Sequence, residues 1–171
     1  MGGLSVFVFF LVCECDKSSE NVTSRGKMGG SDRHDQPWIR VKLRRSQNPA
    51  KKWRAEVLTT GKVVEFGQAG ASDFTTHKDP ARMLRYLIRH GANMPAALRR
   101  QTKKGAVVDG ASVVRQALKV DTTSSREQWG DGDISSAVES AGFWSRWLTW
   151  SFPDLAKAKE HMSARFHILF V

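Results

Sequence analysis

Four basic side chains recur at helical spacing and carry the type of charge that binds phosphate. They are Lys78, Arg82, Arg85 and Arg89. Residues three, four or seven positions apart share one face of an α-helix, so a helix over 80–90 would present the three arginines as a row, with Lys78 just before it. Such a row contacts nucleic-acid phosphates without reading the base sequence. We therefore predict a phosphate-binding surface here, with a plain solvated helix face as the alternative.

A second set of basic side chains alternates with apolar ones in residues 39–44. Arg40, Lys42 and Arg44 fall two positions apart, which places them on one face of a β-strand. We expect this cationic face to extend the basic row of the helix. No zinc finger, RNP sequence or basic zipper accompanies either set, so base-specific recognition is not indicated.

Histidine and acidic residues with catalytic potential do not form a recognised constellation in the sequence. His77 and Asp79 precede the predicted helix and His90 ends it, about 16 Å away at 1.5 Å per residue. Residues 70–74 lack the final glycine of a nucleophile elbow. Residues 131–133 begin like a calcium loop but lack its later ligands. The sequence therefore predicts a non-enzymatic protein with no metal site, no cofactor and no small-molecule substrate.

Tryptophans recur every third residue near the C-terminus, as Trp144, Trp147 and Trp150. On a helix, Trp144 and Trp147 share a face with Leu148, while Trp150 lies about 60° further round. Two interpretations stay open. Large aromatic side chains fill a core beneath a sheet, or the tryptophans and Arg146 form the centre of a protein-docking surface. A membrane-interface segment would need more basic residues than Arg146.

The net charge of +10 is concentrated in the middle of the 171-residue chain. Residues 28–120 hold 19 basic and 7 acidic side chains, net +12, whereas residues 121–171 hold 5 and 7, net −2. This distribution favours a polyanionic partner, either nucleic acid bound non-specifically or an acidic protein. The composition excludes collagen-like, low-complexity and polytopic membrane proteins. Cys13 and Cys15 are too few for a disulfide framework or a tetrahedral zinc site of their own.

Periodicity and capping signals predict the elements that position these residues. Alternation predicts a strand over 39–43 and a β-hairpin over 52–66. Asp79, Pro80 and Gly91 suit the N-cap, the first position and the C′ position of the basic helix. We predict an α+β fold, in which a small antiparallel sheet of about three strands is packed by this amphipathic basic helix and by a Trp-rich C-terminal helix pair.

The pattern is weaker between these elements. Pro95 and Asp109 begin two short helices, and residues 120–133 have the polar, turn-rich composition of an exposed loop. Ser136 and Glu139 have the spacing of a capping box before the Trp-rich helix.

The chain divides into parts of different character. We expect a poorly ordered or mis-annotated N-terminal extension (1–36), a single basic α+β domain (37–166) with an inserted helical segment at about 91–135, and a tail (167–171) that is either an edge strand or disordered. Leu4–Cys13 is an apolar run too short to span a bilayer. Three interpretations of this region stay open: Met28 is the functional start, the segment is a signal or anchor, or it is an ordered strand. Apart from this segment we predict no membrane association.

Two blocks of sequence together resemble a known family. The first contains Phe66, Gly67, Gly70, Ser72, Asp73, Phe74, Thr75, His77, Lys78, Asp79, Pro80, Arg82, Arg85, Tyr86, Arg89 and His90. The second contains Gly142, Phe143, Trp144, Ser145, Arg146, Trp147, Trp150 and Pro153. Both are similar to a small uncharacterised domain of large double-stranded DNA viruses of algae and amoebae, over about 53–90 and 141–160. In that family the blocks lie close together, so the resemblance implies that residues 91–135 are an insertion.

The resemblance implies a viral or virus-derived setting and carries no activity. Together with the basic residues, it predicts a non-enzymatic module that contacts nucleic-acid phosphate, in a virion, nucleus or cytoplasm rather than in the secretory pathway. The alternative is a minor structural or capsid-associated protein that docks a partner through its tryptophans. Residues 72–80 also have a purely architectural interpretation, in which Asp73 and Thr75 satisfy backbone groups before the helix.

Overall fold

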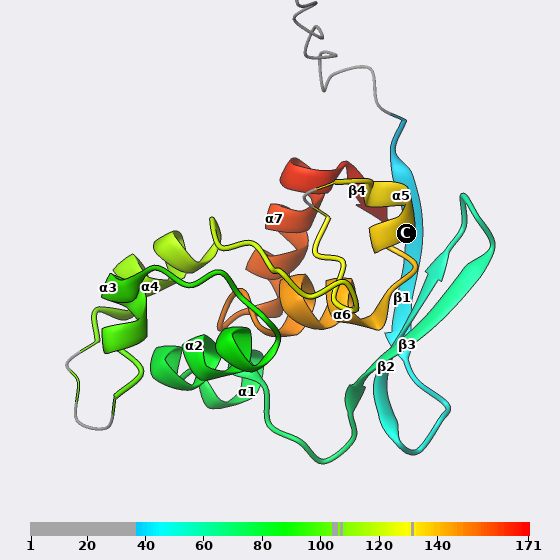
Figure 1. The fold of residues 1–171 in the computed structure, drawn as a ribbon. Coiled ribbons are helices and arrows are strands. Elements are labelled where there is room, and N and C mark those ends of the chain that lie inside the picture. The colour runs from blue at the N-terminus through cyan, green and yellow to red at the C-terminus, as the bar shows by residue number, and fades with distance from the viewer. Residues whose placement is uncertain (1–36, 104–105, 107, 131) are drawn as a thin grey trace, which may run out of the picture. The chain divides into compact units, whose positions relative to one another are not determined.

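The computed structural model describes residues 37–103, 106, 108–130 and 132–171. The three interpretations of the N-terminal region lie outside this part of the chain. Within it, strands and short helices are joined by turns (Figure 1). No helix of the described residues has the length and apolar character needed to cross a membrane.

The sheet has four strands in the order β3-β2-β1-β4. β1 (Ile39–Arg45), β2 (Lys51–Val57) and β3 (Lys62–Gln68) pair in antiparallel fashion, which confirms the predicted strand and hairpin. The C-terminal tail supplies the fourth strand, β4 (Ile168–Phe170), which pairs parallel to β1. The α+β class is confirmed, and the sheet is mixed because the chain returns to β1 after its last helix.

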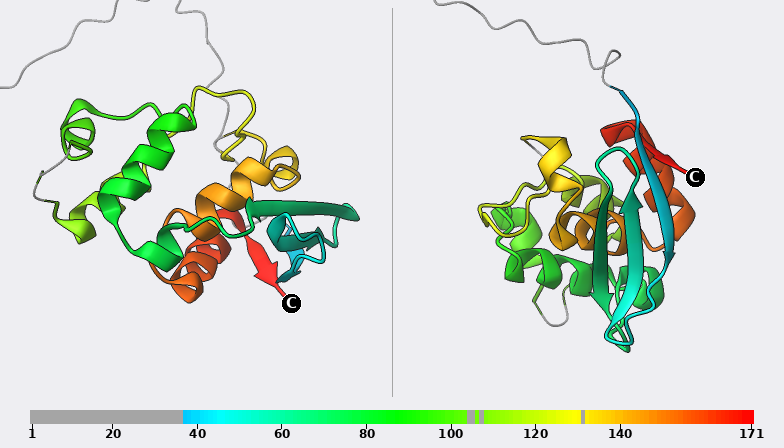
Figure 2. Two further views of the ribbon diagram at one scale, coloured as in Figure 1. Left: turned by 90° about the horizontal axis from the view of Figure 1, so that it is seen from below. Right: turned by 90° about the vertical axis from the view of Figure 1, so that its right-hand side faces the viewer.

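The Trp-rich segment covers one face of this sheet, as predicted. The covering layer consists of α6 (Ala141–Trp144), the π-helical turn η2 (Ser145–Thr149) and α7 (Leu155–Phe166) (Figures 1 and 2). Phe66 of β3 stacks on Trp144, with ring centroids 6.0 Å apart. The buried residues of this first core include Val41, Ala55, Val57, Val64, Phe66, Phe143, Trp144, Trp147, Leu148, Met162 and Ile168.

The basic helix, which we expected on the sheet, lies in a second core. α2 (Pro80–Arg89) packs on α1 (Phe74–His77) and on α4 (Gly110–Ala117), and α3 (Ala96–Arg100) also packs on α4. The buried residues of this core include Phe74, Met83, Leu84, Leu87, Leu98, Val113, Ala117 and Trp129. The predicted packing of this helix on the sheet is wrong because the larger side chains of α6, η2 and α7 already fill the inner sheet face.

Residues 120–133 are not a simple exposed loop. Val120 and Trp129 are 4% and 1% exposed, and both belong to the second core. The polar composition of the segment concealed this burial, because the two apolar side chains are nine positions apart and follow no regular period.

The capping box predicted at Ser136 is also absent from this part of the structure. α5 (Ile134–Ala137) begins at Asp133, whose carboxylate accepts hydrogen bonds from the Ser136 amide at 3.3 Å and hydroxyl at 2.6 Å. Ser140 caps α6 instead, since its Oγ accepts from the Phe143 amide at 3.1 Å. Ser136 therefore lies inside α5, and Asp133 rather than Ser136 is the N-cap of that helix.

Candidate nucleic-acid interface

Two glycines of the first sequence block shape the end of β3 and the turn that leads to α1. Gly67 and Gly70 have left-handed φ angles of 70° and 75°, a conformation that side chains with a Cβ rarely adopt. Ser72 is half-buried and directly precedes Asp73. This turn brings Asp73 to the start of α1, beside β2.

Asp73 fixes the corner between the sheet and α1. Its carboxylate accepts hydrogen bonds from Thr75 Oγ1 at 2.6 Å, from Thr76 Oγ1 at 3.2 Å and from Lys52 Nζ at 2.7 Å. Burial alone would raise the pKa of Asp73, but the hydrogen bonds from Lys52 and Thr75 outweigh it and lower the pKa below its ordinary value. The side chain thus binds other side chains, rather than the backbone groups that the architectural interpretation names.

Replacing Asp73 by asparagine should flatten the acid dependence of stability. A carboxylate whose pKa is lowered on folding stabilises the fold above its unfolded pKa, and this contribution is lost as the pH falls through the folded value. The free energy of unfolding of the unmodified protein should therefore fall more between about pH 5 and about pH 2.5 than that of Asp73→Asn. Urea unfolding at stepped pH measures both. Lys52→Met should flatten the curve as well, and parallel curves for all three proteins would contradict this assignment.

A second carboxylate starts α2, as predicted. Asp79 accepts hydrogen bonds from two amides of the first turn, at 2.9 and 3.1 Å, and Pro80 occupies the first helical position. Gly91, at φ 77°, follows the C-cap residue. The backbone N–H of Asp79 also donates to Nδ1 of His77 at 2.9 Å. Together these contacts set the direction in which α2 leaves the corner.

Three members of the basic row, Arg82, Arg85 and Arg89, lie on the exposed side of α2, and Lys78 lies just before the helix, at the C-cap of α1. Lys78, Arg82, Arg85 and Arg89 are all exposed. Arg85 lies 3.8 Å from Asp79, and both side chains are nearly half exposed, so this ion pair is weak. Among the described residues, Lys78, Arg82 and Arg89 have no ion-pair partner. The row therefore keeps most of its charge available for an external anion.

Burial, and to a smaller extent the basic row, lower the pKa of His77. Burial of the ring lowers the pKa of the imidazole, and the charges of Arg82 and Arg85 lower it further, against the opposing effect of Asp79. The neutral imidazole is therefore favoured, which agrees with its Nδ1 accepting a hydrogen bond. His77 is thus a structural acceptor beside the row.

The two histidines at the ends of α2 do not meet. His90 Nδ1 lies 2.7 Å from Glu127 Oε1, in the segment that precedes α5, whereas His77 contacts Asp79 at the opposite end of the helix. Within the described ranges, no group of three or more His, Cys, Asp or Glu side chains is placed to hold a metal ion.

The basic residues of β1 do not extend the row. Arg40, Lys42 and Arg44 alternate with the residues that face the first core, so they lie on the sheet face that points away from α6 and α7. In Figures 1 and 2 the α6–α7 layer stands between the sheet and α2. The expectation of one continuous basic surface is wrong because the core helices separate the two sets.

The tryptophan cluster is part of the core. Trp144 and Trp147 are 0% exposed. Their indole N–H groups donate to the carbonyl oxygens of Val138 and Trp129, each at 2.7 Å. Arg146 is also 0% exposed, and its guanidinium lies 4.3 Å from the centre of the Trp147 ring. These side chains offer no surface to a partner in this fold, which favours the core interpretation over the docking interpretation.

Trp150 belongs to the other core. Its ring lies parallel to that of Tyr86, with centroids 4.2 Å apart and an interplanar angle of 1°. It also contacts the ring of His77 at 5.4 Å. Trp150 is only partly buried, and it links the end of η2 to α2.

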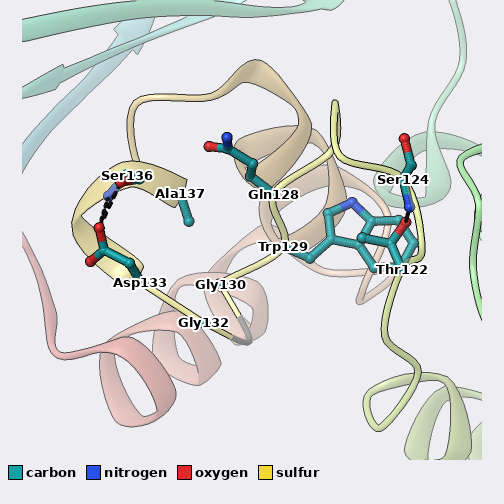
Figure 3. A pocket seen from close by; sticks show the side chains of 9 residues that line it. All are labelled: Thr122, Ser124, Gln128, Trp129, Gly130, Gly132, Asp133, Ser136 and Ala137. Carbon is teal, nitrogen blue, oxygen red and sulfur yellow. Dashed lines mark hydrogen bonds between the residues drawn. The ribbon is translucent and has the colours of Figure 1, made fainter.

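A hollow of about 350 Å³ lies beside Trp129 (Figure 3). It is lined by Thr122, Ser124, Gln128, Trp129, Gly130, Gly132, Asp133, Ser136 and Ala137. The Ser124 amide donates to Thr122 Oγ1 at 3.0 Å, and the Ser136 hydroxyl donates to the Asp133 carboxylate at 2.6 Å. These two polar pairs are satisfied locally, whereas Nε1 of Trp129 is buried with no hydrogen-bond partner among the described residues.

Sequence reasoning gave no role to Trp38, whose residue surface is 52% exposed. Its ring stacks on that of His167, with centroids 5.4 Å apart and an interplanar angle of 21°. The available signal was its position two residues before Arg40, on the same side of the predicted strand.

One segment of the chain matches a known protein family. Residues 41–90 match a family of unknown function (DUF5754). The match runs from β1 to the end of α2, and it covers less than half of the chain. It supports an uncharacterised domain in the region of the first sequence block and assigns no activity. Comparisons with curated proteins and with solved structures gave no match.

Proposed function

We propose that the protein binds nucleic-acid phosphates, without sequence preference, through the basic row of α2. The observation that carries this proposal is the exposure of Lys78, Arg82 and Arg89 with no ion-pair partner among the described residues. The resemblance to a domain of large DNA viruses adds a setting in which a small basic protein associates with the genome.

The surroundings of the row support this assignment. Residues 74–103 hold seven Lys and Arg against one Asp, a net charge of +6. Arg99, Arg100 and Lys103, at and after the end of α3, are also exposed. A surface with this charge attracts polyanions before any specific contact forms.

The spacing of the row also suits a phosphate backbone. At 1.5 Å per residue, Arg82, Arg85 and Arg89 span about 10 Å along the axis of α2. Successive phosphates on one strand of B-DNA rise by about 3.4 Å along the helix axis. The three arginines therefore reach about three consecutive phosphates, and nothing in their geometry selects a base.

The alternative function, a structural or capsid-associated role, has less support because its proposed contact surface is buried. A minor structural or capsid-associated role depended on a partner docking at Trp144 and Trp147, which are fully buried. An acidic protein partner for the basic row is the remaining competitor, and the binding experiment separates it from nucleic acid.

Reversing the charge of the row should weaken nucleic-acid binding and its salt dependence together. We expect Arg82→Glu/Arg85→Glu/Arg89→Glu in the full chain to bind a short mixed-sequence duplex about tenfold or more weakly at low salt. Because each phosphate contact releases counterions, the slope of log affinity against log salt should fall by about 3. Fluorescence anisotropy over a salt series measures both quantities.

The matched control has the same change of net charge elsewhere. Lys119, Arg126 and Lys157 are exposed and lie outside the row. Their triple reversal to Glu should leave most of the slope intact. Equal losses in both triple variants would contradict the site, and an unmodified protein that does not bind at low salt would contradict the function and leave an acidic protein as the partner.

A further inference from the structure

The large apolar side chains that remain exposed gather on one face of the sheet. Within the described residues they are Trp38, Leu58, Val63, Leu169 and Val171, which are 40% to 52% exposed. Strand alternation places them opposite the residues of the first core, such as Val41, Val57, Val64 and Ile168. We call this the open face. Exposed apolar side chains that gather on one face of a sheet favour an interaction site there.

Cationic side chains occupy the middle of the open face. Arg40 pairs with Leu169 of β4 in the sheet register, and on its other side its carbonyl accepts from the Leu58 amide at 2.8 Å. Lys42 lies one step along β1, opposite Glu56. The apolar side chains therefore flank a central basic strand.

The carboxylates of the open face are already engaged by other cations. Glu56 accepts from Arg54 at 3.0 Å and lies 3.6 Å from Arg44, and Glu65 lies 3.9 Å from Arg54. Among the described residues, Arg40 and Lys42 have no ion-pair partner. An occupant that covers this face must neutralise them, because burying an unpaired charge is costly. The occupant is therefore anionic.

Trp38 adds an aromatic surface at the end of the basic strand. One side of its ring stacks on His167, and the 52% exposure of the residue leaves the other side accessible. Nucleobases stack on exposed aromatic rings of this kind, with little preference among bases.

We propose that the open face binds single-stranded nucleic acid, with a base stacked on Trp38 and the backbone phosphates along the cationic residues of β1. Alternate residues of a strand are about 6.6 Å apart at 3.3 Å per residue. That is about twice the 3.4 Å by which successive phosphates on one strand of B-DNA rise along the helix axis. The row on β1 therefore fits an extended strand with unstacked bases, which leaves a base free to reach Trp38. This site is separate from the basic row of α2 and does not rest on it.

The test compares single and double strands on variants of the open face. We expect Trp38→Ala in the full chain to bind labelled oligothymidylate about tenfold more weakly, which is the effect of losing one base stack. Trp38→Phe should retain most of the affinity, and binding of a duplex of equal length should not change. Oligothymidylate should also quench part of the tryptophan fluorescence of the unmodified protein, and this part should be missing in Trp38→Ala.

A charge variant and its control complete the test. Arg40→Glu/Lys42→Glu should weaken oligothymidylate binding more than Lys119→Glu/Lys157→Glu, which changes the net charge equally at exposed positions. If neither Trp38→Ala nor the β1 variant differs from its control, the open face is not a nucleic-acid site and belongs to an acidic protein partner. A loss in the β1 variant alone would also overturn the proposal, because it shows phosphate contact without a base. If the α2 reversal has no effect while Trp38→Ala does, the function proposed for α2 fails and this one stands.

Discussion

Trp144→Ala should lower the free energy of unfolding by about 3–5 kcal/mol, because it removes a fully buried aromatic contact between the sheet and its helical layer. The indole is 0% exposed, stacks on Phe66 at 6.0 Å and meets Phe143 edge-on at 5.3 Å. Its N–H donates to the Val138 carbonyl at 2.7 Å, so the substitution also leaves that oxygen without this donor. Urea unfolding followed by far-UV circular dichroism measures the change in midpoint and slope.

Two control variants show whether the loss in Trp144→Ala comes from its buried packing. Trp38→Ala removes the same side chain at an exposed position and should change the free energy of unfolding by about 0.5 kcal/mol or less. Trp144→Phe keeps an aromatic ring against Phe66 and should lose less than Trp144→Ala. A loss under about 1 kcal/mol in Trp144→Ala would show that the indole is not packed in the core, and the docking interpretation of the tryptophans would regain its surface.

The sequence predicted the elements whose signals are local. The strand over 39–43 and the hairpin over 52–66 follow from period-two alternation, and both appear as β1, β2 and β3. The start and end of α2 follow from Asp79, Pro80 and Gly91, whose side-chain and backbone preferences act within one turn. These elements can therefore be predicted without knowing which other elements pack against them.

The partner of each apolar face could not be predicted in the same way. The apolar face of α2 could pack against any apolar surface. The sheet was the only such surface that the alternating pattern of the sequence predicted. Its actual partners include Val113 and Trp129, from a segment that looked like an insertion and from a polar loop. β4 is only three residues long, and its pairing with β1 depends on where α7 ends rather than on its own pattern.

The same limit applies to the candidate sites. Exposure of the α2 row followed from helical spacing, because a polar face opposite an apolar stripe is a local property. The separation of β1 from α2 did not, since it depends on which helices lie between them. The apolar members of the open face lie in or directly beside all four strands, and only the sheet register brings Leu58 and Leu169 to either side of Arg40.

Four consecutive side chains are buried in the π-helical turn η2. Residues 146–149 are all buried, which an ordinary amphipathic helix on one surface does not produce. Trp147 and Leu148 belong to the first core, whereas the Arg146 guanidinium lies 5.2 Å from the centre of the Trp129 ring, in the second. The segment therefore stands between the two cores, and Arg146 connects them.

Arg146→Ala should accordingly destabilise the fold by about 3 kcal/mol, through an unfilled volume and a carbonyl that loses its donor. One guanidinium nitrogen donates to the Ala117 carbonyl at the end of α4, and another donates to Ser151 Oγ, each at 2.7 Å. Urea unfolding measures the loss. The second core should open first, so hydrogen exchange in α4 should rise more than in the sheet.

Arg146→Met tests whether volume or charge is the larger part of this effect. An apolar side chain of similar length fills the space and avoids burying a charge, which often offsets the lost hydrogen bonds. We expect Arg146→Met to lose less than half as much stability as Arg146→Ala. If both variants lose the same amount, the guanidinium hydrogen bonds, and not the packing between the two cores, hold α4 against η2. If neither loses stability, the two cores are held together elsewhere, for example by the stacking of Trp150, which follows η2, on Tyr86 of α2.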